Sequence, residues 1–479
     1  MKISLDNIGI IKDSTINIEG ITVITGKNNS GKTTVGKVVY SLLSATEDLI
    51  ENATKDLIDF AKDLLRNNLL KSDLNLLCRG YNFTNIEKFD DKSDLDSRIL
   101  ILQNILNRKY PELLTLEDMK NYIHFIIEQL QTITVVDLEN LLERNNLLGS
   151  FKKKYVKNFD NKRELYINEC IKIIDLIDRY SDFVAYERKK IMMTLSEEFN
   201  DQIAPVKIKE KVISTIKIEN DNKTYSIKFN NKDHYFTDNG VLFFNENNNI
   251  IFIDDVTVID SAYPGYYNSK KHYLNGDDFE NCIHFYNHNL FLLNKLVKEQ
   301  GIVKSIYEDN NYQKIESKIN TILNDDIIIN DGKYVLSSDN LYISNLAMGS
   351  KLFAIIKMLL KNGSINENTV LVLDEPESHL HPEWQNVFSE IIAILVKELS
   401  VKVIITSHSP NFVLGLQTFS IKYGLSKITN FYKTEKLDDY FVKYKNVNDN
   451  ISIIYSDFAK YFSKIKSLYD FLILGDNND

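Results

Sequence analysis

The sequence predicts an α/β fold in which buried parallel strands end at one polar edge of a sheet. Three short apolar runs support this prediction: Ile21–Thr25, Val370–Leu373 and Val401–Thr406. Each has the length and β-branched content of a strand that is buried on both faces. Because such folds bind ligands at the carboxyl ends of their strands, the residues that follow each run are candidate site residues.

The first run is followed by a glycine-rich phosphate-binding loop. Glycines allow backbone angles that direct N–H groups at phosphate oxygens, and the helix that follows adds its positive end. We expect Lys32 to reach the β- and γ-phosphates of ATP and Thr33 to ligate Mg²⁺. The alternative is a turn without a ligand, although strand, loop and helix stand in the order that the motif requires. The segment matches G-x-x-x-x-G-K-[ST] followed by Thr, and its predicted nucleotide-binding residues are Gly26, Asn28, Asn29, Ser30, Gly31, Lys32, Thr33 and Thr34.

The second run ends in a pair of acids, Asp374 and Glu375. A buried strand would deliver both carboxylates to the polar edge of the sheet. We expect Asp374 to hold Mg²⁺ and Glu375 to act as the general base on the attacking water. Taken alone, this segment also fits an ordinary strand followed by an acidic turn.

The third run ends at Ser407 and His408. The segment between Asp374 and His408 leaves room for one helix and one return strand, which is a single right-handed crossover. His408 is therefore expected beside the acid pair, where its imidazole could contact the γ-phosphate or the attacking water. A lone histidine at a strand end is otherwise more often structural.

Together these motifs resemble the ABC-type ATPase heads of the SMC, RecF and OLD group. The chain is similar in particular to bacterial stand-alone ATPases with the motif D-E-P-E-x-x-L-H-P-x-x-Q, which here runs from Asp374 to Gln385. The opening Met1–Gly9 and the segment Ile21–Gly26 also match the first strands and loop of that group. The resemblance covers the start of the chain, to about residue 40, and its end, from about residue 340 onward. It implies a head-to-head dimer that hydrolyses ATP.

The resemblance also implies a signature segment that one subunit donates to the ATP of the other. The candidate is the segment Ser344–Lys351, ahead of a helix expected over Leu352–Leu360, with Gly349 contacting the nucleotide in trans. The usual L-S-G-G-Q is replaced by Leu-Ala-Met-Gly-Ser, so Ala347 stands where a serine is expected. The alternative is a helix cap at Ser344 or Asn345 with no further role.

The middle of the chain lacks one expected residue and contains one possible metal-binding pair. Relatives carry a glutamine after a strand, and no glutamine follows Ile250–Ile253 here, so none is assigned. His284 and His288 lie at positions i and i+4 beside Cys282 and could share a helix face around a metal ion. No fourth ligand is evident, and a histidine pair without metal is the simpler interpretation.

The order of elements predicts a discontinuous ATPase head with an insertion. Apolar residues at helical spacing predict a compact helical insertion, and the segment after it, to about residue 262, alternates as strands do. The predicted parts are residues 1–45 (head with phosphate loop), 46–204 (helical insertion), 205–275 (β-rich part) and 276–479 (signature helix, acid pair and histidine).

Composition excludes several classes of protein. No apolar run is long enough to span a membrane, and a strand at the N-terminus does not fit a signal peptide. Three isolated cysteines form no disulfide or metal framework, which suits a cytoplasmic location. The formal net charge of −10 argues against a uniformly DNA-binding surface. Local basic runs at Lys152–Lys157 and Arg188–Lys190 leave DNA open as a partner.

Spacing separates this chain from other nucleotide-driven machines. Most of the chain lies between Lys32 and Asp374, which is too far for a hexameric AAA+ motor, and the helical insertion is foreign to transporter ATPases. The segment 409–479 is too short for the Toprim nuclease of OLD proteins, so we expect none after His408.

By resemblance, we expect a homodimeric or larger ATPase that uses ATP and Mg²⁺. It would act as sensor or scaffold for a separate nuclease or toxin in anti-phage defence. The alternatives are a RecF-like repair ATPase that binds DNA and a nucleotide-locked scaffold with negligible turnover.

Overall fold

The computed structural model divides the chain into two compact units, here called the sheet unit (residues 1–47, 190–270 and 285–479) and the helical unit (residues 48–189 and 271–284). The structure describes residues 1–72, 94–137, 139, 156, 158–181, 183–208, 212–220, 223–229, 234–236, 249–263, 283, 286–298 and 310–475. The sequence placed the limits of the insertion at residues 46 and 204, so the division at residue 190 falls earlier than expected.

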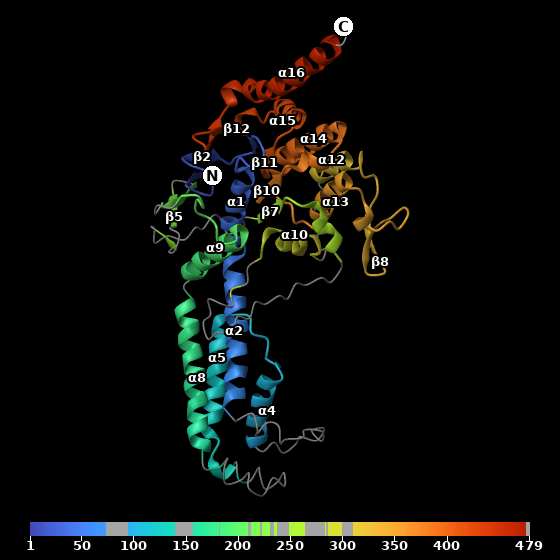
Figure 1. The fold of residues 1–479 in the computed structure, drawn as a ribbon. Helices are drawn as coiled ribbons and strands as arrows, with labels where there is room; N and C mark the ends of the chain where they lie inside the picture. Colours follow the sequence, from blue (N-terminus) through green and yellow to red (C-terminus); the bar gives the residue numbers. More distant parts are fainter. Residues whose placement is uncertain are drawn as a thin grey trace. The chain divides into compact units, whose positions relative to one another are not determined.

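The sheet unit is organised around a six-stranded sheet with the order β13-β12-β3-β11-β10-β7 (Figure 1). Five of these strands are parallel, and only β13 runs antiparallel, against β12. The strand that precedes the phosphate loop, β3, lies beside β11, and β11 lies beside β10. The strands are β3 (Ile21–Thr25), β7 (Asn249–Ile253), β10 (Thr369–Asp374), β11 (Lys402–Ser407), β12 (Thr429–Lys436) and β13 (Val442–Asn446).

The register of these strands brings their carboxyl ends into line. Asp374 pairs with Thr406, and Ser407 pairs with Thr25. Every residue of β3 and β7 is buried, as expected of strands covered on both faces. The predicted α/β fold of a P-loop NTPase is therefore confirmed, with all three apolar runs in one parallel sheet.

Helices cover both faces of this sheet. On one face, α1 (Lys32–Thr46) packs its Val35, Val38 and Val39 against β7 and β10 residues such as Phe252 and Val372. On the other face, a second core joins α10 (His288–Leu296), α12 (Asn310–Ile319), α13 (Met348–Lys361), α14 (Pro382–Leu399) and α15 (Pro410–Lys422). A C-terminal helix, α16 (Ser452–Gly475), follows β13.

An antiparallel sheet completes the sheet unit, with the order β2-β1-β4-β5-β6. It joins the start of the chain to the segment after the helical insertion, because β1 pairs with β4. Its strands are β1 (Lys2–Asp6), β2 (Ser14–Asn17), β4 (Ser214–Asn220), β5 (Lys223–Phe229) and β6 (His234–Phe236). A separate hairpin pairs β8 (Ile327–Asn330) with β9 (Lys333–Leu336).

The helical unit has its own apolar core. The core joins Leu65 and Leu69 of α2 to Ile123 of α5 and Cys170 of α8. Thr115 and Asp118 form a reciprocal capping box at the start of α5. Its helices are α2 (Leu49–Lys71), α4 (Asp94–Leu106), α5 (Leu116–Thr132) and α8 (Phe159–Tyr180), and α9 (Phe183–Phe199) follows them in the chain.

Two local expectations were wrong. The signature helix α13 begins at Met348, ahead of the expected Leu352. Its N-cap is Ala347, and the alternative of a cap at Ser344 or Asn345 is not found. The N-cap there makes no side-chain hydrogen bond, so the sequence carries no capping signal for this start. Residues Val256–Ser261 form a 3₁₀ helix, although the segment 205–262 was expected to consist of strands.

In the part of the chain that the structure describes, none of the helices has the length and hydropathy to cross a membrane.

Candidate functional site

The phosphate-binding loop joins β3 to α1 through glycines that packing requires. A Cβ atom at Gly26 would lie 1.9 Å from Thr434 Oγ1, so only glycine fits there. Gly31 has φ 75°, in the left-handed region that glycine adopts without strain, and it is the N-cap of α1. No side chain caps this helix start, which leaves its N-terminus suited to an anion. Asn28 and Asn29 are exposed, while Ser30 is buried and donates a hydrogen bond to the carbonyl of Lys27 at 2.7 Å.

Lys32 is folded back into this loop. Its side chain is only 5% exposed, and Nζ donates hydrogen bonds to the carbonyls of Gly26 at 3.2 Å and Lys27 at 2.9 Å. Nζ also lies 3.1 Å from Glu375 Oε1. The ammonium group therefore occupies the centre of the loop and is paired with one of the two predicted acids.

Asp374 joins the loop to the neighbouring strand. Thr33 Oγ1 donates a hydrogen bond to Asp374 Oδ2 at 2.6 Å, and the hydroxyl of Thr406 bonds the other carboxylate oxygen. Burial raises the pKa of Asp374, and the nearby charges of Glu375 and Asp254 raise it further, against the two hydroxyl hydrogen bonds. A hydroxyl and a carboxylate that share a hydrogen bond in an acidic surrounding are a donor set that fits Mg²⁺.

Glu375 stands between two cationic or titratable groups. Its backbone has φ 48° and ψ 48°, a left-handed conformation that few non-glycine residues adopt and that often marks functional sites. Two hydrogen bonds from its N–H to Thr406, at 3.1 Å to the carbonyl and 3.0 Å to Oγ1, hold this conformation. One carboxylate oxygen faces Lys32, and the other lies 3.2 Å from Nδ1 of His408. The strand ends thus bring together all three predicted catalytic side chains.

Glu377 is a site residue whose role the sequence analysis did not assign. It is 2% exposed, and Oε1 accepts hydrogen bonds from Ser407 Oγ at 2.7 Å, His408 N at 3.0 Å and Ser409 N at 3.3 Å. Burial raises its pKa, against these hydrogen bonds. Glu377 therefore fixes the turn that carries His408. The signal was present in the motif, whose second glutamate comes soon after Glu375.

Gln385, the last residue of that motif, supports the same turn from α14. Its amide nitrogen donates to the carbonyl of Leu380 at 3.1 Å. Its amide oxygen accepts hydrogen bonds from Ser409 Oγ at 3.0 Å and Asn411 Nδ2 at 3.2 Å. The acid-pair loop and the start of α15 are thereby tied together.

A cluster of ion pairs lies at the end of β7, with His288 and Glu198 buried and Asp254 exposed. Asp254 follows β7 directly and so lies at the same polar edge as Asp374. His288 Nε2 is 2.8 Å from Asp254, and Nδ1 is 2.8 Å from Glu198 of α9. The ring is stacked on Phe252 with centroids 4.4 Å apart. Burial alone would lower the pKa of His288, but hydrogen bonds and charges from the two carboxylates outweigh burial and raise this pKa to about 9.

One member of the histidine pair, His288, belongs to this cluster. Both ring nitrogens of His288 face carboxylates, so the ring has no nitrogen left for a metal ion. His284 and Cys282 lie outside the described residues. Over the described residues, no group of three or more His, Cys, Asp and Glu side chains could hold a metal ion.

The signature segment presents its backbone on one side and packs on the other. Ser344, Asn345 and Ala347 are exposed, ahead of the first turn of α13. Gly349 is buried in that turn, and a Cβ atom there would lie 2.8 Å from the carbonyl oxygen of His379 in the same chain. Gly349 is therefore required for packing within its own subunit, whatever it contacts in a second one.

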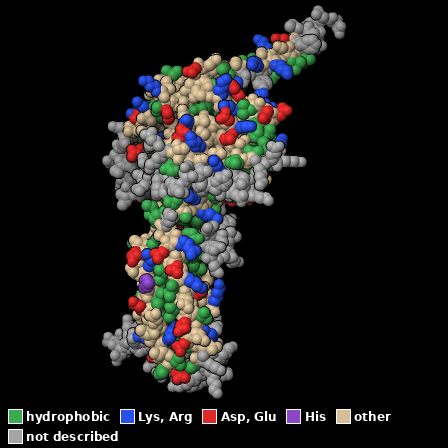
Figure 2. Space-filling model, turned by 90° about the vertical axis from the view of Figure 1, so that its left-hand side faces the viewer, with side chains coloured by type: hydrophobic (Ala, Val, Ile, Leu, Met, Phe, Trp, Pro, Cys, Tyr) green, Lys and Arg blue, Asp and Glu red, His purple; other side chains and the backbone are tan. Residues whose placement is uncertain are grey.

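The basic run Lys152–Lys157 was a candidate for DNA contact, and nearly all of it lies outside the described residues. On the face shown in Figure 2, Lys and Arg side chains are interspersed with Asp and Glu over the described surface.

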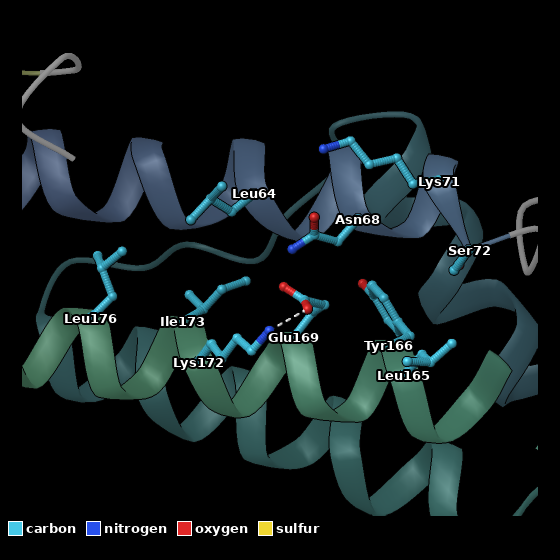
Figure 3. A pocket seen from close by; sticks show the side chains of 10 residues that line it. All are labelled: Leu64, Asn68, Lys71, Ser72, Leu165, Tyr166, Glu169, Lys172, Ile173 and Leu176. Atoms are coloured by element: carbon cyan, nitrogen blue, oxygen red, sulfur yellow. Dashed lines mark hydrogen bonds and ion pairs between the residues drawn. The ribbon is translucent and has the colours of Figure 1, made fainter. Parts of the chain in front are cut away.

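A cavity of about 500 Å³ lies in the helical unit between α2 and α8 (Figure 3). Apolar side chains such as Leu64 and Ile173 line it together with the polar Asn68, Lys71 and Glu169, and no predicted site residue belongs to it.

One family of known proteins matches the sequence of this chain. A sequence model of the family described as "AAA domain, putative AbiEii toxin, Type IV TA system" matches residues 172–414, about half of the chain. The matched range includes β10 and β11 with Asp374, Glu375 and His408, and it begins after the phosphate-binding loop. None of the curated proteins matches the chain.

Three similar solved structures are SMC heads. The first is an SmcHead bound to the C-winged helix domain of ScpA, with 10% identity, a TM-score of 0.40 and coverage of 94% of this chain and 98% of that chain. The SMC head domain from Thermotoga maritima has 9% identity, a TM-score of 0.35 and coverage of 93% and 98%. The Smc head with an extended coiled coil from Pyrococcus furiosus, bound to the C-terminal domain of ScpA, has 11% identity, a TM-score of 0.26 and coverage of 97% and 98%. The fold is assigned here from the strand order and the positions of the motifs.

Proposed function

The chain belongs to this AAA domain family, and on that premise we propose that it is an ABC-type ATPase whose hydrolytic site is completed when two heads meet. The observation that carries the proposal is the meeting of Lys32, Glu375 and His408 at the carboxyl edge of one parallel sheet. A phosphate loop, an acid pair and a histidine on adjacent strands are the parts that phosphoryl transfer to water needs.

The proposed roles follow from the contacts. The N–H groups at the start of α1 and Lys32 would bind the phosphates of ATP. Thr33 and Asp374 would hold Mg²⁺, which neutralises phosphate charge when bound. Lys32 would leave Glu375 for the phosphates, and Glu375 would then be free to take a proton from water. His408 would donate to the γ-phosphate or the water while Glu377 holds its backbone.

The second half of the site would come from another copy. Within one chain, the phosphate-binding loop and the strand ends supply all the cations and hydrogen-bond donors described above. The start of α13 offers a second exposed helix N-terminus. In a head-to-head dimer, this start of α13 in the partner subunit would face the γ-phosphate. ATP would then hold the two heads together, and hydrolysis would release them.

The role beyond ATP turnover is proposed to be that of a sensor or scaffold for a separate effector. The family description links such domains to toxin–antitoxin systems, which supports a role beside a toxic partner. The resemblance of the motifs to defence ATPases of the OLD and Septu kind points the same way. The effector would be a nuclease or toxin on another chain, and the head dimer would hold or release it according to the nucleotide bound.

The experiment is to purify the chain, measure phosphate release from ATP with and without Mg²⁺, and follow head engagement by crosslinking between the heads. We expect Mg²⁺-dependent release and an ATP-dependent increase in the closed, head-engaged form. Absence of nucleotide binding would contradict the assignment of the site itself, whereas binding without turnover would favour a nucleotide-locked scaffold.

A further inference from the structure

The C-terminal helix α16 exposes an unusual amount of apolar side chain. Six large residues from position 462 onward, mostly in its second half, are between 48% and 73% exposed: Phe462, Ile465, Leu468, Tyr469, Leu472 and Ile473. Single exposed apolar residues are common, but contiguous patches of more than a few hundred Å² mark interaction sites. Figure 1 shows this half of α16 continuing past α15, and Figure 2 shows green and blue side chains together on it.

The first half of the same helix shows how this face is used. Ile454 is buried in the core of the sheet unit, and Tyr455 and Phe458 pack against that core. Tyr455 also donates a hydrogen bond to Gln417 of α15 at 2.8 Å. The face that packs against the body at the start of α16 thus continues toward its C-terminal end, where Phe462, Ile465, Tyr469 and Leu472 are exposed.

The spacing of these residues is that of a coiled-coil seam. From Tyr455 the apolar positions are 455, 458, 462, 465, 469 and 472, which alternate by three and four along the chain. Leu468 and Ile473 fall on the flanking g and e positions of this heptad. In a parallel pair of such helices, a g residue contacts the e residue of the following heptad on the other helix, so Leu468 would lie near the partner's Ile473.

The opposite face of α16 is polar. Ser463, Lys464 and Ser467 are exposed there, and none of these positions belongs to the seam. A parallel pair therefore places apolar side chains at every a and d position of the exposed half and leaves these charged and hydroxyl groups in water. The same patch serves both copies, as a two-fold interface requires.

The area is also that of a specific interface. The six exposed side chains together present roughly 700 Å² per copy, which is the most that they could bury and is of the same order as the ~800 Å² that each partner contributes to an interface of standard size. We propose that α16 pairs with α16 of a second copy in a parallel two-helix seam, and that this pairing does not require nucleotide.

The pairing would be a second contact, distinct from the proposed head-to-head interface. Because it tethers two copies, it makes the meeting of their heads an intramolecular step with a high effective concentration. ATP binding would then close the heads of a dimer that already exists, and hydrolysis would open them. ATP would not be needed to assemble the dimer from monomers.

The test is the mass of the full chain without nucleotide, measured by sedimentation at micromolar concentration. We expect a dimer for the wild-type chain and a monomer for the double variant Ile465→Glu, Leu472→Glu. The matched control is Ser463→Glu, Ser467→Glu, which adds the same charges on the opposite face and should remain dimeric. A cysteine introduced as Leu472→Cys should crosslink two copies under oxidation more strongly than Ser467→Cys.

Several outcomes would overturn the proposal. A wild-type chain that is monomeric without nucleotide, or a seam variant that remains dimeric, would each contradict it. Wild-type protein that stays monomeric in buffer but sediments with anionic phospholipid vesicles would assign α16 to a membrane surface instead. ATP binding by the seam variant shows that the sheet unit is folded, so loss of pairing cannot be confused with loss of the proposed ATP site.

Discussion

The hydroxyl of Thr33 donates a 2.6 Å hydrogen bond to the carboxylate of Asp374, a residue 341 positions further along the chain. This contact joins the phosphate-binding loop to the acid pair within one subunit. It also shows why the site is assembled by the sheet: Thr33 follows β3, Asp374 ends β10, and β11 between them supplies Thr406 to the same carboxylate.

Asp374→Asn should separate stability from function. Burial and neighbouring acids disfavour the charged carboxylate, so its neutral amide should leave the nucleotide-free protein as stable as the wild type or more stable. The variant should lose the stabilisation that saturating Mg-ATP gives, which is about 2.7 kcal/mol at a hundred times Kd. Thermal unfolding with and without Mg-ATP measures both effects. A variant that Mg-ATP stabilises as much as the wild type would rule out Asp374 as a metal-holding residue.

Lys32→Ala should abolish ATP binding. The side chain is 5% exposed and directed into the loop, so its loss removes the cation that the phosphates would meet. Calorimetric titration with ATP measures the effect, and Lys27→Ala is the matched control because that side chain is exposed in the same loop. Unchanged affinity in Lys32→Ala would refute the phosphate-loop assignment.

Ala347 offers a cleaner test of the composite site than Gly349 does. Any side chain at Gly349 would collide with the carbonyl of His379 in its own chain, so loss of activity there would prove nothing about a second subunit. Ala347 is exposed at the N-cap of α13, where both Asp and Ser improve capping. Ala347→Asp should keep ATP binding but lose ATP-dependent closure and turnover, because it places a negative charge beside the γ-phosphate bound to the partner subunit.

Ala347→Ser is the control for that experiment. It caps the helix in the same way without adding charge, and it should retain or increase turnover. Normal closure and hydrolysis in Ala347→Asp would mean that the segment serves only to begin α13, and the head-to-head site would have to be abandoned.

His288 predicts a pH dependence of stability. Its pKa is raised to about 9 in the folded chain, against about 6.5 when unfolded, so its stabilising charge is fully present below about pH 6.5. That contribution, on the order of 3 kcal/mol, should be lost as the pH rises through 9. Denaturant unfolding of wild-type protein and His288→Gln should show a stability difference that shrinks between about pH 6.5 and 9.5. A difference that is constant over this range would mean that the imidazole is neutral.

The local patterns in the sequence were enough for the central sheet but not for its surroundings. Runs such as Ile21–Thr25 are buried on both faces, so their composition alone identifies them, and the short segment from Asp374 to His408 permits only a neighbouring parallel strand. The cluster of Asp254, His288 and Glu198 left no such pattern. Its members come from the end of β7, from α10 and from α9. Only the folded chain places Nδ1 of the ring 2.8 Å from Glu198 and Nε2 2.8 Å from Asp254.

The start of α13 was missed for a different reason. Ala347, Met348 and Gly349 contain none of the side chains that cap helices. The close packing of Gly349 against the carbonyl of His379 is a tertiary contact that the local sequence does not reveal. Glu377 differs from this case, because its place in the motif can be recognised in the sequence. Its hydrogen bonds to the turn at His408 are apparent only in the folded chain.

The central claim is that Glu375 takes the proton from the water that attacks ATP, and Glu375→Gln tests it most directly. The amide keeps the size of the side chain and removes the base, so the variant should bind ATP with affinity near that of the wild type. The measurement is the rate of phosphate release at saturating Mg-ATP, with binding measured on the same sample. We predict a fall of at least about a hundredfold, or about 2.7 kcal/mol in the barrier, with the ATP-bound assembly accumulating. Turnover within about threefold of the wild-type rate, a change below ~1 kcal/mol, would contradict the account.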